Sequence, residues 1–599
     1  MFPSLFRSGP AVAPMRRLGM VTAVVGLLSA CTGNIGSGGN PGGDRPGVGQ
    51  SGENGSMGGR PNGGGSSNGG EVVVPPPPPE NAPVTGPFAS APAPSSRLVR
   101  LSHQQWENTV TDLFGMDEPS GLSREFLSEP IRSTFDNNGS ILQVTTDLWQ
   151  DYQKAAEALG RAAREPARRM RFLPGGGQDA EAFIRSFVKQ AYRRPLTDDE
   201  VRAHRALFDQ GAQLVGSGDA FADGVEVLVT AVLQSPHFLY RVELSNAVEN
   251  GLVRLSGYEV ASRLSYGLTN SMPDGPLFAA AEANQLAQRD QVMAQATRLL
   301  ESERGKETLR DFHTQVWHLG AYTEVKRDEE RFPAFDAAMG PDMQAEAHAF
   351  IEEVIFGNEK GVTELLTAPY SYVNPRLAPL YGVEVPGEDN SRFVRVDLDP
   401  QRRAGLYTQI GFLAVNATDA APRSIMRGVH INLDALCIDL PAPPNVPPDP
   451  PEDVGKTNRQ LLEAFTEADG TVCVGCHGAL INPPGFAFEN FDGLGQWRDM
   501  DNGQPIDATG TFDFGEGPKP FQGPVELMKV VAQSPMSHAC YAQHLLEYLF
   551  GRERVKEGPL KAADDGVIAE LGRRSQKDVS IKSMILDLVA TDAFVTRLP

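Results

Sequence analysis

One short stretch, Cys473-Val474-Gly475-Cys476-His477, constrains the structure of this chain more than any other feature. Two thiols separated by two residues can each form a thioether with one porphyrin, and the next residue can then offer an imidazole nitrogen to the iron. The C-x-x-C-H order therefore predicts one covalently attached haem c. Cys473 and Cys476 would hold the ring, and His477 would be an axial ligand of the iron.

Other interpretations of the same stretch fit the sequence less well. A structural zinc site would need two more ligands at short spacing, and the chain has no second C-x-x-C and no H-x-x-x-H pair. A thioredoxin-like redox pair would follow a strand in a βαβ unit, which the surrounding sequence does not resemble. A plain disulfide or dithiol stays open. Downstream, Asn482-Pro483-Pro484-Gly485-Phe486 reads as a turn whose aromatic ring can pack beside a haem edge.

The N-terminal sequence is typical of an export signal. Met15-Arg16-Arg17 is positively charged, and the apolar run that follows is too short to span a bilayer as a mature helix. It ends in Leu28-Ser29-Ala30-Cys31, which resembles the lipobox of bacterial lipoproteins, so we expect cleavage there and lipidation of Cys31. An ordinary secretory peptide cut after Ala30, or a signal anchor, is the alternative. Thr32, which is not acidic, favours the outer membrane, facing the periplasm or the cell surface.

The two remaining cysteines suggest a disulfide. Cys437 and Cys540 would lie in an exported, oxidising compartment, where cysteines commonly pair. We therefore expect a Cys437–Cys540 bond that ties the segment before the haem loop to a later helix. Two separate buried thiols are the alternative.

Charge and hydropathy exclude several classes of partner. The formal net charge is −22 and there is no basic cluster, which argues against binding to nucleic acid or to anionic membrane surfaces. No other stretch has about 18 uncharged apolar residues, so we expect membrane contact through the N-terminal lipid alone.

Periodicity predicts a mainly α fold of multi-helical domains, with a cytochrome c-like helical haem module near the C-terminus and short hairpin strands at most. Capping boxes at Ser102, Thr197 and Ser256 mark helix starts, and Phe393 to Val396 is the clearest strand. Gly224 to Val242 reads as a core helix that breaks at Pro236. Further helices are expected at 141–172, 181–192, 286–302, 304–319, 340–357, 541–550 and 578–590.

Shifts in composition and the positions of glycine- and proline-rich stretches divide the chain into segments. Residues 32–96 are rich in glycine, serine and proline, cannot bury a core, and are expected to form a disordered tether. Pro441 to Pro450 reads as an extended strap. The expected ranges are 1–31 signal peptide, 32–96 linker, 97–175 and 176–248 helical domains, 249–395 central helical domain, 396–515 haem module and 516–599 C-terminal helical domain.

Other candidate catalytic groups are hard to single out. No G-x-S-x-G, H-E-x-x-H, Walker or dinucleotide-binding motif is present. Six histidines lie on expected helices without partner spacing, and surface or hydrogen-bonded core positions are the better interpretation of each. They are His103, His204, His237, His313, His318 and His348.

Phrases along the chain resemble one family. They include Leu101-Ser102-His103-Gln104-Gln105-Trp106, Tyr192-Arg193-Arg194-Pro195-Leu196-Thr197, His237-Phe238-Leu239-Tyr240-Arg241, Arg427-Gly428 and Gly495-Gln496-Trp497-Arg498. From about Arg97 to the C-terminus the chain is similar to multi-domain bacterial proteins built from domains of unknown function with a planctomycete-type cytochrome c-like signature. The resemblance implies a mainly helical, exported haem protein and no established reaction.

A second axial ligand would decide what the haem does. Methionine opposite histidine suits electron transfer, whereas an open position suits small-molecule chemistry. Met528 is a possible distal ligand; Met426, Met500, Met536, His538 and His544 are alternatives, and each can equally be an ordinary core or surface side chain. Arg498 could pair with a haem propionate, since guanidinium binds carboxylate as a fork, or form a salt bridge with Glu489 or Asp492.

Three functions remain in competition. We favour an envelope electron-transfer lipoprotein with one haem c and an unknown redox partner protein. A haem-dependent oxidoreductase of the peroxidase or oxygenase type is the first alternative, so enzymatic activity stays open. A surface polysaccharide-binding or scaffold protein with a structural haem is the second.

Overall fold

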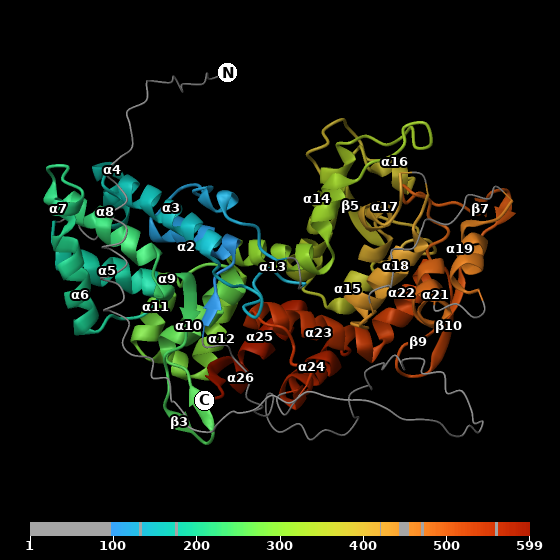
Figure 1. Ribbon diagram of the computed structural model, residues 1–599. Helices are drawn as coiled ribbons and strands as arrows, with labels where there is room; N and C mark the ends of the chain where they lie inside the picture. Colours follow the sequence, from blue (N-terminus) through green and yellow to red (C-terminus); the bar gives the residue numbers. More distant parts are fainter. Residues whose placement is uncertain are drawn as a thin grey trace, which may run out of the picture.

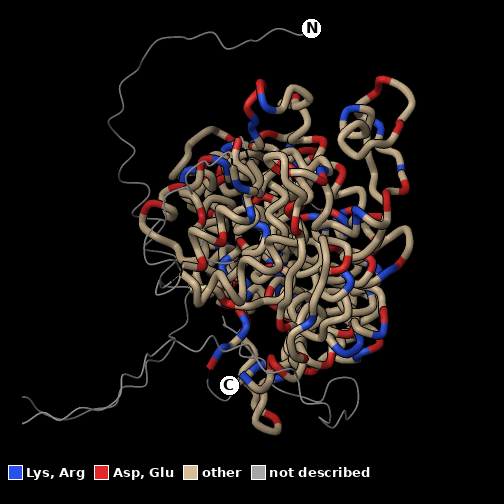
Figure 2. The backbone as a smooth tube through the Cα atoms, turned by 90° about the vertical axis from the view of Figure 1, so that its right-hand side faces the viewer, with Lys and Arg blue, Asp and Glu red and all other residues tan. Residues whose placement is uncertain are grey.

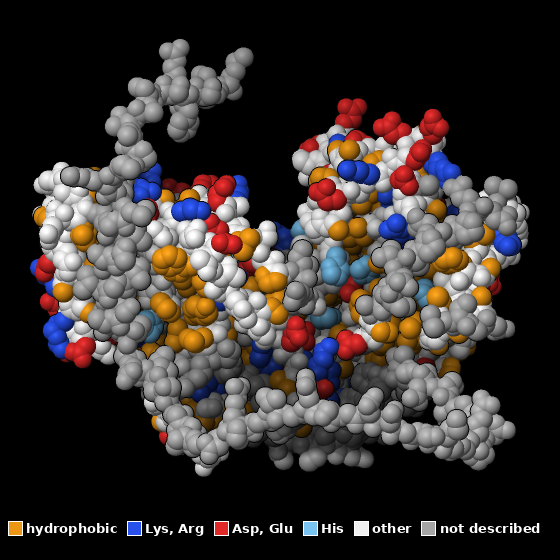
Figure 3. Space-filling model, in the orientation of Figure 1, with side chains coloured by type: hydrophobic (Ala, Val, Ile, Leu, Met, Phe, Trp, Pro, Cys, Tyr) orange, Lys and Arg blue, Asp and Glu red, His pale blue; other side chains and the backbone are white. Residues whose placement is uncertain are grey.

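The computed structural model describes residues 98–130, 134–173, 178–419, 421–441, 455–468, 473–557 and 561–599. Cys31, the tether and most of the expected proline strap lie outside these ranges. Within them the protein is mainly helical, as the periodicity predicts, and its longest strands have five residues. Two lobes stand side by side, with the C-terminal helices below them (Figure 1), and the space-filling view shows a hollow between the lobes (Figure 3).

The first lobe is a helical bundle whose two chain ends meet in a small two-stranded antiparallel sheet. Its elements are β1 (Leu98–Arg100), α2 (His103–Leu113), η1 (Leu122–Glu125), α3 (Thr146–Ala163), α4 (Pro166–Phe172), α5 (Ala180–Tyr192), α6 (Asp198–Asp209), α7 (Gly211–Leu214), α8 (Ala220–Leu233), α9 (Pro236–Leu239) and β2 (Tyr240–Val242). β1 pairs antiparallel with β2, Leu98 opposite Val242.

The middle of the chain alternates helices with short strands. Its elements are β3 (Val248–Glu249), β4 (Leu252–Arg254), α10 (Gly257–Thr269), α11 (Gly275–Glu282), η3 (Gln285–Ala287), α12 (Arg289–Leu300), α13 (Glu303–Val316), η4 (Leu319–Glu324), α14 (Met339–Glu352), η5 (Glu353–Gly357), α15 (Val362–Thr367), β5 (Tyr370–Val373), α16 (Ala378–Tyr381) and β6 (Val394–Asp397). β5 pairs antiparallel with β6.

The last third carries the C-x-x-C-H stretch. Its elements are η6 (Leu406–Thr408), α17 (Ile410–Val415), α18 (Ser424–His430), η7 (Ile431–Ala435), α19 (Asn458–Thr466), α20 (Val474–Cys476), η8 (His477–Ile481), α21 (Asn482–Phe486), β7 (Met500–Asp501), β8 (Gln504–Pro505), β9 (Thr509–Asp513), β10 (Pro518–Gln522), α22 (Gly523–Gln533), α23 (Pro535–Phe550), α24 (Lys561–Ser575), α25 (Ile581–Val589), α26 (Asp592–Val595) and β11 (Thr596–Arg597). β11 returns to pair with β4, so the chain end is tied to the middle segment.

Two hydrophobic cores hold these elements. The first lies inside the N-terminal lobe and includes Trp106, Phe183 and Val229. The second is one continuous core that contains Phe135 and then runs from Leu255 to Phe594, so the middle and last thirds are packed as one body. α10 serves both cores, because Tyr266 belongs to the first and Leu264 to the second.

The predicted helix starts are present, because capping depends on local sequence. Ser102, Thr197 and Ser256 each accept a hydrogen bond from the backbone N–H three residues on, and each capping box is complete. The apolar run from 224 ends differently from the prediction. α8 and α9 are separated at Ser235 as expected, but Tyr240–Val242 form β2 and do not continue the helix, because they pair with β1.

The surface mixes charges of both signs. In the backbone view of Figure 2, basic and acidic residues are both scattered along the chain. In the part of the chain that the structure describes, no helix is long and apolar enough to cross a membrane.

Candidate haem-attachment site

The C-x-x-C-H residues form a short helical segment on the protein surface. The backbone N–H of His477 donates to the carbonyl of Cys473 at 2.9 Å, which closes one helical turn around Cys476. Residues three and four apart on a helix share a face, so both thiols and the imidazole lie on the same side. Cys473 is exposed, Cys476 is half-buried, and both are free thiols. Both sulfurs are therefore available for thioether formation.

The side chain of Asn482 fixes the orientation of His477. Nδ1 of His477 lies 3.0 Å from Oδ1 of Asn482, which is almost fully buried. Nδ2 of Asn482 donates to Oγ1 of Thr466 at 2.9 Å and to Oε1 of Glu467 at 2.7 Å.

These contacts leave one tautomer for the imidazole. Thr466 uses its hydroxyl proton on the carbonyl of Leu462 at 2.7 Å, so towards Asn482 it can only accept. The amide of Asn482 must therefore present its oxygen to His477, and Nδ1 of His477 must carry a proton to donate. Nε2 is then left with its lone pair, the form in which an imidazole binds a metal.

Three consecutive helical segments hold this turn against the second core. η8 is a π-helix that continues α20, and α21 follows it directly. The sequence-based turn at 482–486 is therefore wrong. Pro483 and Pro484 occupy the first turn of α21, where a missing N–H costs little, so the two prolines start a helix there.

Glycines allow α18 to pack closely against η8 and α21. A Cβ on Gly428 would overlap the carbonyl oxygen of Ile481, and one on Gly485 would overlap that of Ser424. Next to Gly428, the fully buried Arg427 donates to the carbonyls of Phe488, Phe491, Leu413 and Asp492, each at 3.0 Å. Arg427 and Gly428 thus stabilise the packing of α18 against η8 and α21, the helices that carry and follow the candidate haem-attachment segment.

Arg498 already has carboxylate partners. Its Nη1 lies 2.5 Å from Oδ1 of Asp501, and its Nη2 lies 3.7 Å from Oε2 of Glu489. Glu489 is buried and also accepts from Ser424 at 2.6 Å and from Asn458 at 2.8 Å; burial raises the pKa of its carboxyl. The salt bridge to Glu489 is the alternative that the sequence left open, and pairing of Arg498 with a propionate stays a prediction.

The candidate distal ligands lie in different surroundings. Met528 is fully buried in α22, which packs against α15, β10 and α23. Met536 is also buried, and both ring nitrogens of His538 have partners, Ser575 and the Ala532 carbonyl. Met426 is 38% exposed and lies on α18, the helix that packs against η8. Met528 as the distal ligand stays a prediction, and Met426 is the alternative next to the attachment segment.

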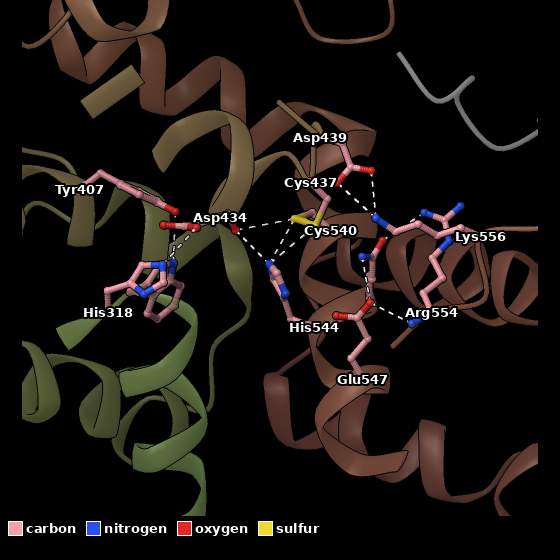
Figure 4. The surroundings of a disulfide bond; sticks show 12 residues. His318, Tyr407, Asp434, Cys437, Asp439, Cys540, His544, Glu547, Arg554 and Lys556 are labelled. Carbon is pink, nitrogen blue, oxygen red and sulfur yellow. Dashed lines mark hydrogen bonds and ion pairs between the residues drawn. A yellow bond between two sulfur atoms is a disulfide. The ribbon is translucent and has the colours of Figure 1, made fainter. Parts of the chain in front are cut away.

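Cys437 and Cys540 are joined in a disulfide, with an S–S distance of 2.03 Å (Figure 4). The bond connects the segment after η7 to α23, as the sequence analysis proposed. Nε2 of His544 lies 3.6 Å from the sulfur of Cys437 and 3.4 Å from that of Cys540. His544 is therefore a neighbour of the disulfide.

Several functional candidates were not found from the sequence. The sequence predicts a turn at Asn482 and gives no role to its side chain, although an amide five residues after a candidate axial histidine is a possible partner for Nδ1. His318 was expected on a helix without a partner, but it follows α13 in a left-handed conformation with φ of 52° and pairs with Asp434. By contrast, His313 is fully buried and hydrogen-bonded to the Leu309 carbonyl and the Tyr541 hydroxyl, the kind of core histidine expected.

Comparison with known protein families gives five matches in succession. Each is described as a protein of unknown function: residues 100–165 match DUF1587, 179–243 match DUF1595, 255–383 match DUF1592, 403–501 match DUF1588 under the name PSCyt3, and 517–594 match DUF1585. The match at 403–501 contains the whole C-x-x-C-H stretch. No curated protein and no solved structure shows significant similarity to the chain.

Proposed function

We propose that this chain of successive domains of unknown function is a c-type cytochrome-like protein of the bacterial envelope that carries one covalent haem and transfers electrons. The observation that carries the proposal is the common helical face of Cys473, Cys476 and His477. Two accessible thiols and an imidazole whose Nε2 keeps its lone pair are the donor set that haem c attachment needs. The name PSCyt3 of the family matched at 403–501 is consistent with it.

Cys473, Cys476 and His477 offer the two thiols and the imidazole that a covalent haem c requires. The thiols would anchor the ring, and Asn482 would hold the proton of His477 at Nδ1 and keep Nε2 directed at the iron. When bound, the haem would supply a one-electron couple whose potential depends on its axial ligands. Arg498, which is 23% exposed, is the candidate partner of a propionate, although its guanidinium contacts Asp501 and Glu489.

We also propose that Cys31 carries lipid and that residues 32–96 hold the folded part away from an outer membrane, facing the periplasm or the cell surface. The support is the sequence alone: a short apolar run that ends at Cys31, followed by chain of linker composition. A Cys31→Ser variant should leave the membrane fraction for the soluble fraction, whereas a Thr32→Ser control should stay with the membrane.

Production in a host that matures c-type cytochromes tests the haem. Wild-type protein should give a pyridine haemochrome of one haem per chain and a matching increase in intact mass, and Cys473→Ser with Cys476→Ser should lose both. Val474→Ala, between the two thiols, is the matched control and should keep the haem. Absence of added mass in the wild type would overturn the proposal.

The ferrous spectrum then separates electron transfer from haem enzymology. An electron-transfer haem with two firm axial ligands should be low-spin and should not react with carbon monoxide. Met528→Ala and Met426→Ala, compared side by side, would show which methionine, if either, binds the iron. Rapid carbon monoxide binding by the wild-type protein would argue against electron transfer and for a haem-dependent oxidoreductase.

A further inference from the structure

A second group of metal-ligating side chains lies apart from the C-x-x-C-H segment. His318 follows α13, His430 is the last residue of α18, and Asp434 lies one turn further on in η7. Nδ1 of His430 lies 2.8 Å from Oδ2 of Asp434, and Nε2 of His318 lies 3.7 Å from Oδ1 of the same carboxylate. The two rings have centroids 5.3 Å apart, so the three side chains face one another.

The spacing of these atoms suits a single ion. Ligand atoms about 2.1 Å from a metal, at angles between octahedral and tetrahedral, lie roughly 3.0–3.5 Å from each other. The distances of 2.8 and 3.7 Å, each to a different oxygen of Asp434, lie close to that range, and one donor atom from each residue falls within 4.8 Å of the others. Two imidazoles and one carboxylate form the donor set of catalytic zinc sites and of non-haem iron(II) sites.

The surroundings of Asp434 favour a cation. Its side chain is 10% exposed, and a buried carboxylate needs a compensating positive charge. The phenols of Tyr322 and Tyr407 are fully buried, and burial is the main reason that the pKa of each is raised; the negative charge of Asp434 adds to both shifts, after that of Glu346 in the case of Tyr322. Within the part of the chain that the structure describes, the buried hydroxyl of Tyr322 has no hydrogen-bond partner, although buried hydroxyl groups normally form at least one hydrogen bond.

The site is open on one side. The side chain of His318 is 51% exposed, whereas that of His430 is 19% exposed. In the space-filling view, histidine side chains gather in the hollow between the two lobes (Figure 3). Three protein ligands with solvent access on one side leave coordination positions for water or a substrate.

The backbone that carries Asp434 is held in place. Three residues further on, Cys437 is bonded to Cys540 (Figure 4). Nε2 of His544 donates to the carbonyl of Asp434 at 3.3 Å. The two sulfurs are joined in a disulfide, so they offer no thiolate to a metal. The available donors are the carboxylate of Asp434 and the imidazoles of His318 and His430.

We propose that His318, His430 and Asp434 bind one divalent first-row transition-metal ion of the zinc and iron(II) class, with open coordination positions on the side where His318 is exposed to solvent. The site is distinct from the proposed haem site, since it shares none of its residues. The two are nevertheless connected through α18 and η7: α18 packs against η8, and Nδ2 of Asn432 donates to the carbonyl of Leu480 at 2.8 Å.

Zinc binding to the full chain, produced without a polyhistidine tag, tests the site. After incubation with Zn²⁺ and gel filtration, elemental analysis should find one zinc per chain, whatever the haem content. The zinc X-ray absorption spectrum should show nitrogen and oxygen neighbours without sulfur, which separates this site from Cys473 and Cys476. His318→Gln should bind Zn²⁺ at least tenfold more weakly.

A second variant and a control make the result decisive. Asp434→Asn should lose zinc in the same way. Because the side chain of Asp434 is buried, that variant could also disturb the fold, whereas His318 is half-exposed and its replacement should leave the fold intact. His348→Gln is the matched control, because His348 is a partly buried histidine that contacts Thr314 at 2.8 Å outside the cluster, and it should bind zinc as wild type does. No zinc uptake, sulfur among its neighbours, or unchanged affinity in His318→Gln would overturn the proposal and leave a hydrogen-bonded His–Asp–His cluster.

Discussion

At the scale of single residues, the orientation of His477 in the candidate haem-attachment segment is set by a neutral amide, that of Asn482. Asn482 is nearly fully buried and all three of its side-chain contacts are directional, so its oxygen faces His477 because no other arrangement satisfies Thr466 and Glu467. A partner at Nδ1 makes an imidazole a better donor to a metal and holds its ring plane.

With the proposed haem bound, Asn482→Ala should therefore change its reduction potential without removing it. The thioethers do not involve Asn482, so the haem content should stay at one per chain, but the weaker imidazole donor should favour the ferrous state. We expect the reduction potential to rise by roughly 60 mV, a tenfold change for one electron. Asn502→Ala, which removes an exposed amide bonded to the Lys456 carbonyl, is the control. Spectroelectrochemical titration measures both, and equal potentials would contradict the assigned role.

Glu346 should make stability depend on pH. It is fully buried in α14, accepts from Ser371 at 2.6 Å and from Tyr381 at 2.5 Å, and burial raises its pKa to about 7. Because the folded state holds the proton more tightly than the unfolded state, this contribution is complete below about pH 4.5 and is lost as the pH rises through 7. The shift corresponds to about 3 kcal/mol.

Glu346→Gln removes this titration and should flatten the pH profile. Thermal melts of wild type and variant between pH 4.5 and 8 give the comparison. Asp136, whose pKa is also raised to about 7 by burial and by Asp311, is present in both proteins, so the difference between the two profiles isolates Glu346. Parallel profiles would show that Glu346 does not titrate in this range.

At the scale of elements, the sequence predicts helix starts, which depend on neighbouring residues, but not the contacts between residues that are far apart in the chain. Capping at Ser102, Thr197 and Ser256 depends on four adjacent residues, so the sequence alone was sufficient. The segment 482–486 differs from the predicted turn because its Asn-Pro-Pro-Gly composition is typical of turns, whereas in the fold it follows η8 directly and its prolines occupy the first turn of α21. His430 and Asp434 have a recognisable i, i+4 spacing, but His318 is more than a hundred residues away, and only the tertiary fold brings its ring next to them.

The crossing of α18 with η8 and α21 leads to a prediction about glycine. Gly428→Ala places a methyl group against the carbonyl of Ile481, and the helices must separate. We expect a loss of about 3 kcal/mol of stability and a lower haem content after maturation. Gly566→Ala in α24, where a Cβ would meet nothing within 4 Å, is the control and should gain up to about 1 kcal/mol from helix propensity. Denaturant unfolding and a haemochrome assay measure both effects.

The disulfide should stabilise the last third of the chain. It closes a loop with a sequence separation of 103, for which restriction of the unfolded chain is worth about 3–5 kcal/mol. Cys437→Ser with Cys540→Ser should lower the melting temperature, and a reductant should lower that of the wild type by a similar amount without affecting the variant. A reductant effect on the double variant would point to another cause.

At the scale of the whole molecule, the two cores meet on one helix. Tyr266 of α10 reaches into the first core, where its hydroxyl lies 3.0 Å from Oγ1 of Thr109 and accepts from Nη1 of Arg193 at 3.1 Å. The helical periodicity of α10 was visible in the sequence. That its opposite faces serve two different cores was not, because periodicity shows which positions are buried but not against what.

Tyr266→Phe should therefore loosen the first lobe and leave the rest unchanged. Removing the hydroxyl leaves a buried guanidinium N–H of Arg193 without its acceptor, at a cost of about 1–3 kcal/mol. Hydrogen exchange should become faster in α2, α5 and α8, while α20 and η8 keep their protection and the haem spectrum stays the same. Tyr258→Phe on the same helix is the control, because the ring of Tyr258 is partly exposed and packs against Phe278. Faster exchange spreading equally into the last third of the chain would mean that the two cores unfold as one unit, and α10 would then couple the lobes more tightly than two separate cores imply.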